Sequence, residues 1–428
     1  MAGFAVKRGS EEGRFSHMRH ASFRLPFGAV SAALGAIVLT SVGVAADSSQ
    51  PPVDESSIQP TTASFGGAEP LATTRTVPHW SSETVNGSDG VTYRYNIVGA
   101  DPATEASATV GVAIIPLDVT VDGVPFNGSD SVDGVVASPL FQTGDYSGTP
   151  ATTFSSHGGP LSAGNTGVQL LDATMRSEFD KVGTDYHVVL GAPAVQDAVA
   201  IDVPAEKGLA MGNSRGVAMA FVDQGWFQTR VQNELGRLHL DPTRLAIFLT
   251  KDVMLYADHD VTHCCALGAH GAGHVTGGLS GSVNGNGNQP VHTFVWASWF
   301  TAGFFLPSAW IARDIFALSH EVTEWANDPF NTNAVQPWSS PPNAPQYGCG
   351  TLLETGDPTF GIGFAAGTNT FDPHSGGVFH IQDEAFLPWF MRTASTSQAL
   401  QVTALGGRYT FMGLLNPAPW FRTPASSC

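Results

Sequence analysis

One His-Glu dipeptide begins a segment whose residue types and spacing could bind and use a metal ion. His320, Glu321 and Glu324 stand in the order His-Glu-Val-Thr-Glu. If the segment is helical, positions four apart lie on one face, so His320 and Glu324 can reach the same ion. Imidazole nitrogen and carboxylate oxygen are ordinary zinc ligands at about 2.0–2.2 Å. Glu321 lies beside them, where it could take a proton from a metal-bound water.

The surrounding residues predict the helix that would hold this motif. Apolar side chains recur over residues 307–327, and Ser308 is a candidate N-cap. Asp328 and Pro329 follow, and a proline disfavours helix at the residue before it. We therefore expect a helix that ends before this pair. Asp328 either caps the helix end or belongs to the motif.

The motif resembles the H-E-x-x-H signature of the zincin metallopeptidases, except that Glu324 stands where the second histidine is expected. It is more similar to a group of secreted zincin-like proteins, including the plant EXORDIUM or phosphate-induced type. Those proteins carry H-E-x-x-E, an Asp-Pro or Asn-Pro pair, and later an E-x-G-D segment beside a cysteine. Here that segment is 354–357, downstream of Cys349. The resemblance implies a zincin-like mixed β-sheet with an active-site helix, and a zinc-dependent peptidase with Glu321 as general base.

A catalytic zinc needs a third protein ligand and keeps one position open for water. The E-x-G-D segment offers two candidates, Asp357 and Glu354. One histidine with two carboxylates is a harder and more anionic ligand set than two histidines with one carboxylate, so manganese or calcium could compete with zinc. This set also lessens the Lewis acidity that acts on a bound water. The residues therefore predict a metal site more directly than they predict hydrolysis.

The rest of the chain predicts an α+β fold. Short apolar runs separated by Asp, Gly and Pro predict strands over 91–126 and 186–193. Apolar spacing predicts helices over 168–179 and 217–238. A further strand over 291–300 is a candidate edge for pairing with an extended peptide. Because helices and strands mix without regular βαβ alternation, we predict α+β rather than a doubly wound sheet.

The chain divides into four expected parts. An uncharged run with small residues at its end predicts a signal peptide over 1–46, although the run is also close to the length of a membrane anchor. Residues 47–78 are rich in Ser, Thr and Pro, which predicts a flexible linker. A β-rich N-terminal portion then covers 79–205. The zincin-like metal-binding portion covers 206–428 and could form one domain with the portion before it.

The charge of the mature chain limits its partners. Removal of residues 1–46 leaves 14 basic and 35 acidic residues, so the net charge moves from −18 to about −21. Such a protein is a poor partner for nucleic acid and for anionic membranes. We therefore expect a secreted, extracellular or periplasmic protein that acts on a peptide or protein substrate, with no membrane contact after signal cleavage. The oligomeric state is left open.

Four cysteines and export together predict two disulfides. The cysteines are an adjacent pair, Cys264 and Cys265, followed by Cys349 and Cys428. Three connectivities are open. The favoured one joins one member of the adjacent pair to Cys349 and the other to Cys428.

Other patterns compete with the metal motif. Residues 212–216 match G-x-S-x-G, so Ser214 could be the nucleophile of a serine hydrolase, with Asp357 and His374 or His380 following in the required order. A nucleophile elbow needs a strand before the serine and a helix after it, and the preceding residues predict a strand poorly.

Polar residues near the adjacent cysteines could bind a second metal, although loops in a Gly-rich exported chain collect such residues anyway. They are Asp258, His259, Asp260, His263, His270 and His274.

Two functions from different classes remain. The first is a secreted zinc-dependent hydrolase, a peptidase in which Glu321 activates a metal-bound water. The second is a non-catalytic exported protein whose metal stabilises the fold or supports binding at a cell surface. Metal binding alone does not require the Glu321 carboxylate, so this residue discriminates between them.

Overall fold

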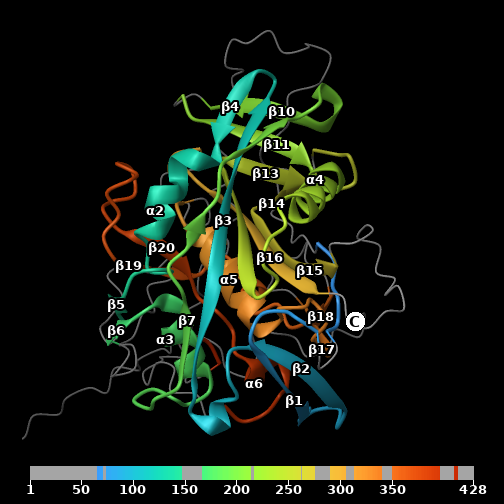
Figure 1. Cartoon of the computed structure of the whole chain (residues 1–428), viewed down its shortest axis with the longest axis vertical. Coiled ribbons are helices and arrows are strands. Elements are labelled where there is room, and N and C mark those ends of the chain that lie inside the picture. The colour runs from blue at the N-terminus through green and yellow to red at the C-terminus, as the bar shows by residue number, and fades with distance from the viewer. Residues whose placement is uncertain are drawn as a thin grey trace, which may run out of the picture.

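The computed structural model describes residues 65–70, 74–146, 166–213, 216–261, 263–274, 290–304, 313–339, 349–395 and 409–412. Over these ranges the protein is α+β, with many strands and few helices, as predicted (Figure 1). The first strands are β1 (His79–Val85), β2 (Thr92–Val98), β3 (Ser107–Val121), β4 (Val124–Asn127), β5 (Gly144–Asp145), β6 (Thr166–Val168), β7 (His187–Leu190), β8 (Ala194–Val195), β9 (Val199–Asp202) and β10 (Gly208–Gly212). The later strands are β11 (Ala218–Asp223), β12 (Arg244–Lys251), β13 (Val253–Tyr256), β14 (Cys264–Ala266), β15 (Gly268–His274), β16 (Val291–Trp299), β17 (Ala334–Ser339), β18 (Cys349–Leu352), β19 (Gly363–Ala366) and β20 (Phe379–Gln382). The α-helices are α2 (Val132–Val136), α3 (Leu170–Glu178), α4 (Gln224–Arg237), α5 (Phe316–Asn327) and α6 (Leu387–Phe390).

The main sheet is mixed and has eight strands. Its central order is β15-β16-β12-β3-β4, and β7, β8 and β9 also pair with the long strand β3 (Figure 1). Strand β12 runs parallel to both β16 and β3, whereas β15 is antiparallel to β16. The sheet therefore combines strands from both portions that the sequence separated at residue 205.

The strand predicted as a free edge lies inside this sheet, so that prediction is wrong. Residues 291–299 form β16, which is hydrogen-bonded to β15 on one side and β12 on the other. The edge strand is β15. Part of its outer side is already occupied, because the Ala272 N–H donates to the Gly66 carbonyl at 3.1 Å.

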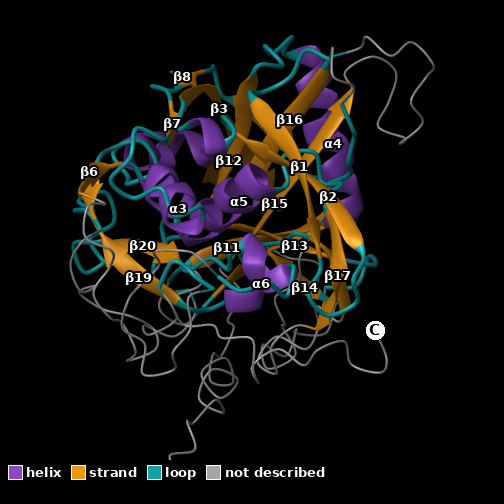
Figure 2. Cartoon of the chain, turned by 90° about the horizontal axis from the view of Figure 1, so that it is seen from below, coloured by secondary structure: helices purple, strands orange, loops and turns teal. Residues whose placement is uncertain are grey.

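Alternation along β16 sends its side chains to two different cores. Val295 and Ala297 pack in the core that contains residues of α5, whereas Phe294 and Trp296 pack in the core that contains residues of α4. The two helices thus lie on opposite faces of the main sheet (Figure 2). His270 pairs with Val295 across the β15–β16 ladder, so its side chain points to the face covered by α5.

The motif helix α5 is shorter at its start than predicted. It ends at Asn327, as the Asp328-Pro329 pair predicted, but it begins at Phe316. Asp314 precedes it with φ of 27° and forms an antiparallel bridge with Phe300, and its carboxylate accepts the Ile315 N–H at 2.7 Å. These contacts hold the chain in a non-helical conformation before Phe316. Ser308, the expected N-cap, lies outside the described residues.

The helix predicted over 217–238 is a strand followed by a helix. Residues 218–223 form β11, and α4 begins only at Gln224. The Asp223 carboxylate accepts the Trp226 N–H at 2.9 Å and so caps the helix start. The helix predicted over 168–179 is confirmed as α3, Leu170–Glu178.

Residues 65–70 belong to the segment predicted as flexible, but here they pack against the fold. Phe65 is fully buried, and its ring lies against those of Phe294 and Trp296. The Ala68 N–H donates to the Phe330 carbonyl at 3.1 Å. Separately, none of the helices that the structure describes is long and apolar enough to cross a membrane; the predicted signal segment lies outside the described residues.

Candidate metal centre

Helix α5 presents the motif side chains toward the main sheet. All of its residues are buried. The His320 Nε2 atom lies 3.1 Å from Glu324 Oε2, as expected for residues four apart on a helix, and 3.8 Å from Glu321 Oε1. One helix therefore contributes an imidazole and two carboxylates to one buried space.

The E-x-G-D segment supplies a further carboxylate. Asp357 opens a short 3-10 helix, Asp357–Thr359, and its Oδ1 atom lies 3.8 Å from His320 Nε2. Donor atoms of His320, Glu324 and Asp357 all lie within 4.8 Å of one another, so this group could hold a metal ion. The Asp357 Oδ1 atom is buried and has no hydrogen-bond partner among the described residues.

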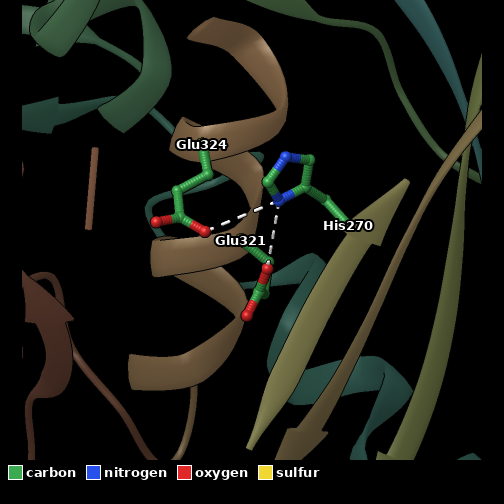
Figure 3. A group of neighbouring side chains, drawn as sticks. All are labelled: His270, Glu321 and Glu324. Carbon is green, nitrogen blue, oxygen red and sulfur yellow. Dashed lines mark ion pairs between the residues drawn. The ribbon is translucent and has the colours of Figure 1, made fainter. Parts of the chain in front are cut away.

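A second histidine, which the sequence placed in a loop, reaches the same helix from β15. His270 Nδ1 lies 3.5 Å from Glu321 Oε2 and 3.5 Å from Glu324 Oε2 (Figure 3). These three residues form a second buried group that could hold a metal ion.

Glu354, the other candidate third ligand, lies on the His270 side of the centre. Its Oε2 atom is 3.8 Å from His270 Nδ1. Its side chain is 18% exposed, whereas that of Asp357 is 4% exposed. Asp357 and Glu354 therefore flank different histidines.

The observed spacings suit a divalent ion. Two ligand atoms at about 2.1 Å from a tetrahedral ion lie about 3.4 Å apart. The separations of 3.1 Å, 3.5 Å and 3.8 Å between imidazole nitrogens and carboxylate oxygens bracket that value. The spacing of these donors is therefore compatible with a bound ion.

Backbone contacts fix the orientation of Glu324. The Gln382 side-chain amide donates to the Gly356 carbonyl at 2.6 Å, and the Gly356 N–H donates to Glu324 Oε1 at 3.0 Å. This leaves Glu324 Oε2 directed at both histidines. Such outer contacts orient a ligand before a metal arrives.

The two imidazoles and Glu324 shift each other's protonation. Burial opposes charge on His270 and His320, but the surrounding carboxylates, chiefly Glu354 and Glu324 respectively, raise the pKa of both well above the usual value. Burial also opposes ionisation of Glu324, but His320 and His270 outweigh it and lower its pKa. Glu324 is therefore ionised between two cationic rings when no metal is bound.

The pKa values of the other carboxyl groups shift in the opposite direction to that of Glu324. Burial raises the pKa of Glu321, and it raises those of Glu354, Asp357 and Glu384 well above the usual value. In the metal-free centre burial thus favours the protonated form of each group. A bound cation would lower these pKa values, because it favours the ionised form of each carboxyl group.

A pocket adjoins one side of the centre. His320, Glu321 and Asp357 line it together with Phe316 and Cys265. Glu321 is thus both near the candidate ligands and on the wall of the pocket.

The cysteine pairing differs from the favoured prediction, which is wrong. Cys264 and Cys265 are bonded to each other, so neither is joined to Cys349 or Cys428. Cys428 lies outside the described residues.

The polar residues near this disulfide do not form one metal site. His259 is hydrogen-bonded to Asp223, His263 pairs with Asp258 at 3.3 Å, and His274 contacts the Pro290 carbonyl at 3.1 Å. Of the histidines in that set, only His270 enters a candidate metal group among the described residues. Its strand, Gly-Ala-His-Gly-Ala-Gly-His, has little intrinsic strand preference, which is why the sequence favoured a loop.

The surroundings of residues 212–216 do not support a nucleophile elbow. Gly208–Gly212 forms β10, a strand that the sequence analysis missed, but the next element is the antiparallel strand β11 rather than a helix. Ser214 itself lies outside the described residues. His380 Nδ1 contacts Asp314 Oδ2 at 2.6 Å, and its Nε2 contacts Arg313 at 3.2 Å, so both ring nitrogens already have partners.

We expect Gly356→Ala to weaken metal binding at least tenfold, the usual scale for disturbing the contacts that orient a ligand. A Cβ at this position would overlap the His320 ring, so the imidazole would have to move. Calorimetric titration of metal into both proteins tests this. Gly225→Ala is the matched control, because its Cβ would meet only Asp223 Oδ1 at 3.6 Å. Unchanged affinity in Gly356→Ala would show that the His320 position does not matter for binding.

Comparison with models of protein families, with curated proteins and with solved structures found no match. The zincin-like fold implied by the motif therefore stays a prediction, whereas the mixed α+β architecture and the buried groups that could hold a metal stand on the structure itself.

Proposed function

We propose that this chain is an exported metal-dependent hydrolase that cleaves peptide bonds. The observation that carries the proposal is the convergence of His320, Glu324 and Asp357 on one buried point, with Glu321 beside them on the wall of a pocket. Export rests on the predicted signal peptide, residues 1–46, and is tested by amino-terminal sequencing of the mature protein, which is expected to begin at or near Asp47. A protein in which residues 1–40 are intact would contradict it.

Each residue has a distinct role in this proposal. His320, Glu324 and Asp357 hold the ion. Zinc bound there would acidify a water molecule and polarise the scissile carbonyl. Glu321 takes the proton of the attacking water and delivers it to the leaving amine. Because the ligand set is rich in oxygen, manganese or calcium could replace zinc.

The edge of β15 supports a peptide as the substrate. His270 and Gly268 share the strand orientation of Ala272, whose N–H points away from β16 toward Gly66. Their backbone groups therefore also point away from β16, and residues 268–273 are buried in the structure. An extended peptide could add to this edge as a further strand, with its scissile bond near the centre, once the chain that covers the edge is displaced. Nucleic acid is not an expected partner, because the mature chain carries a net charge of about −21.

The second candidate function is a metal that only stabilises the fold of a non-catalytic exported protein. Low exposure of the candidate ligands favours it: the side chains of His320 and Glu324 are 8% and 3% exposed. A structural site is closed, whereas a catalytic site keeps an exchangeable position.

Glu321→Gln separates the two functions. The amide keeps the shape of the side chain but cannot take a proton, so we expect the variant to retain the ion bound by His320, Glu324 and Asp357 and to lose at least a hundredfold in hydrolysis of an unstructured protein substrate. Metal content and cleavage rate are measured on the same preparations. Glu206→Gln, at an exposed position in a short 3-10 helix, is the control. Equal hydrolysis by Glu321→Gln and the wild type, or none by either, would contradict the enzymatic proposal.

A further inference from the structure

We propose that the centre holds two divalent cations, one beside His320 and Asp357 and one beside His270 and Glu354, with Glu321 and Glu324 between them. This deepens the proposed function and rests on it, since it concerns the same buried site. The sequence motif accounts for one ion only.

The donor atoms fall into two groups rather than one. His320, Glu324 and Asp357 form the first group, and His270, Glu321 and Glu324 form the second. Each group contains one histidine, and Glu324 is the only member they share. Two imidazoles that belong to separate groups point to two ion positions.

Two carboxylates span the space between the histidines. Glu324 Oε2 lies 3.1 Å from His320 Nε2 and 3.5 Å from His270 Nδ1. Glu321 directs Oε1 to His320 at 3.8 Å and Oε2 to His270 at 3.5 Å. An oxygen about 2.1 Å from each of two ions would set them no more than about 4 Å apart, which is the usual spacing in two-metal sites.

Asp357 and Glu354 give each histidine one further carboxylate neighbour. Asp357 lies on the His320 side and Glu354 on the His270 side, each 3.8 Å from its histidine. The whole centre then has two histidines and four carboxylates, with Glu324 placed as the bridge and Glu321 beside both ions as the general base. This is the donor composition of known di-iron and di-manganese carboxylate centres.

Charge also favours two ions over one. The four carboxylates are largely buried, and no lysine or arginine among the described residues forms an ion pair with them. When all four carboxylates are ionised, one divalent cation compensates only two of them, and uncompensated charges are costly in a low-dielectric interior. Two cations balance all four. The Asp357 Oδ1 atom is buried, has no hydrogen-bond partner among the described residues and can therefore bind a cation.

Metal stoichiometry of the full chain tests the proposal. Protein stripped by chelation is titrated with Zn²⁺ alone, and bound metal is counted by elemental analysis after desalting. We expect two ions per chain in the wild type and one in His270→Ala. The control is His274→Ala on the same strand, whose ring contacts the Pro290 carbonyl and lies in neither candidate metal group, so this variant should retain two ions. If His270→Ala does not fold, Glu354→Gln should lower the affinity for the second ion alone.

Loading the protein with Mn²⁺ shows whether the two ions lie close together, and this measurement does not depend on enzymatic activity. Two bridged ions should give an exchange-coupled electron paramagnetic resonance spectrum, which His270→Ala should replace with the spectrum of an isolated ion. One ion in the wild type, unaffected by His270→Ala, would overturn the two-ion proposal and leave the proposed function intact. Two magnetically isolated ions would also overturn it. No bound ion at all would overturn both.

Discussion

Removal of the bound metal at pH 7.5 is expected to lower the melting temperature of the protein by roughly 5 °C. A ligand present at about 1,000 times its Kd stabilises a folded protein by about 4 kcal/mol, and a chain of this size shifts by little more than 1 °C for each kcal/mol. The candidate ligands come from three separate parts of the fold: β15, α5 and the segment that includes Asp357. Loss of the cation therefore loosens the contact between the sheet and its central helix.

Melting curves recorded by circular dichroism, with and without chelator, measure this effect. The double variant His270→Ala/His320→Ala is the control, since it lacks both imidazoles and should melt at the same temperature in either condition. Identical melting temperatures for wild-type protein with and without chelator, when elemental analysis confirms that metal was present and was removed, would contradict a metal that supports the fold.

The sequence predicted the motif helix and its chemistry because the signals were local. His320 and Glu324 are one helical turn apart, so a helix sufficed to place them together. The end of the helix at Asn327 followed from the proline at 329. Its start was not predictable, since Asp314 is held by a bridge to Phe300 and by contact with His380, both of which depend on the tertiary fold.

The role of His270 could not be read from the sequence for a different reason. It lies on a strand of glycines and alanines, whose small side chains let α5 approach but hide the strand pattern. A Cβ at Gly268 would come within 2.6 Å of Glu321 Oε1. The close packing of β15 against α5 thus explains why this strand consists mainly of glycines and alanines, but it is known only from the fold. Strand order is equally non-local, which is why β16 was taken for an edge.

Metal-free protein is expected to lose stability as the pH rises from about 4 to about 7. Burial raises the pKa of Glu178 and of Asp383 to about 7 and that of Asp252 to about 6, and none of these groups is a candidate ligand. A carboxyl group with a raised pKa in the folded state binds its proton more tightly there than in the unfolded chain. The loss of folding free energy that results from ionising this group is absent below its pKa in the unfolded chain, near 4. It is complete above its pKa in the folded protein.

Each such group contributes a slope of up to about 1.4 kcal/mol per pH unit within its window. His292 acts in the opposite direction, because burial lowers its pKa to about 4, so its contribution improves as the pH rises toward 6.5. Three carboxyl groups outweigh one imidazole over this range. The net slope for metal-free protein is therefore negative between pH 4 and pH 7.

The stability of metal-loaded protein should depend on pH differently, because protons compete with the cation for His320 and Asp357 and metal binding releases them. The stabilisation contributed by metal therefore grows with pH, and the gap between loaded and metal-free protein should widen from pH 5 to pH 7.5. Urea unfolding at several pH values, with and without metal, measures both slopes. Glu178→Gln removes one of the raised carboxyl groups and should flatten the metal-free slope while leaving the gap unchanged. A gap that stays constant across this range would show that the cation does not bind through ionisable side chains, which would exclude the centre at α5.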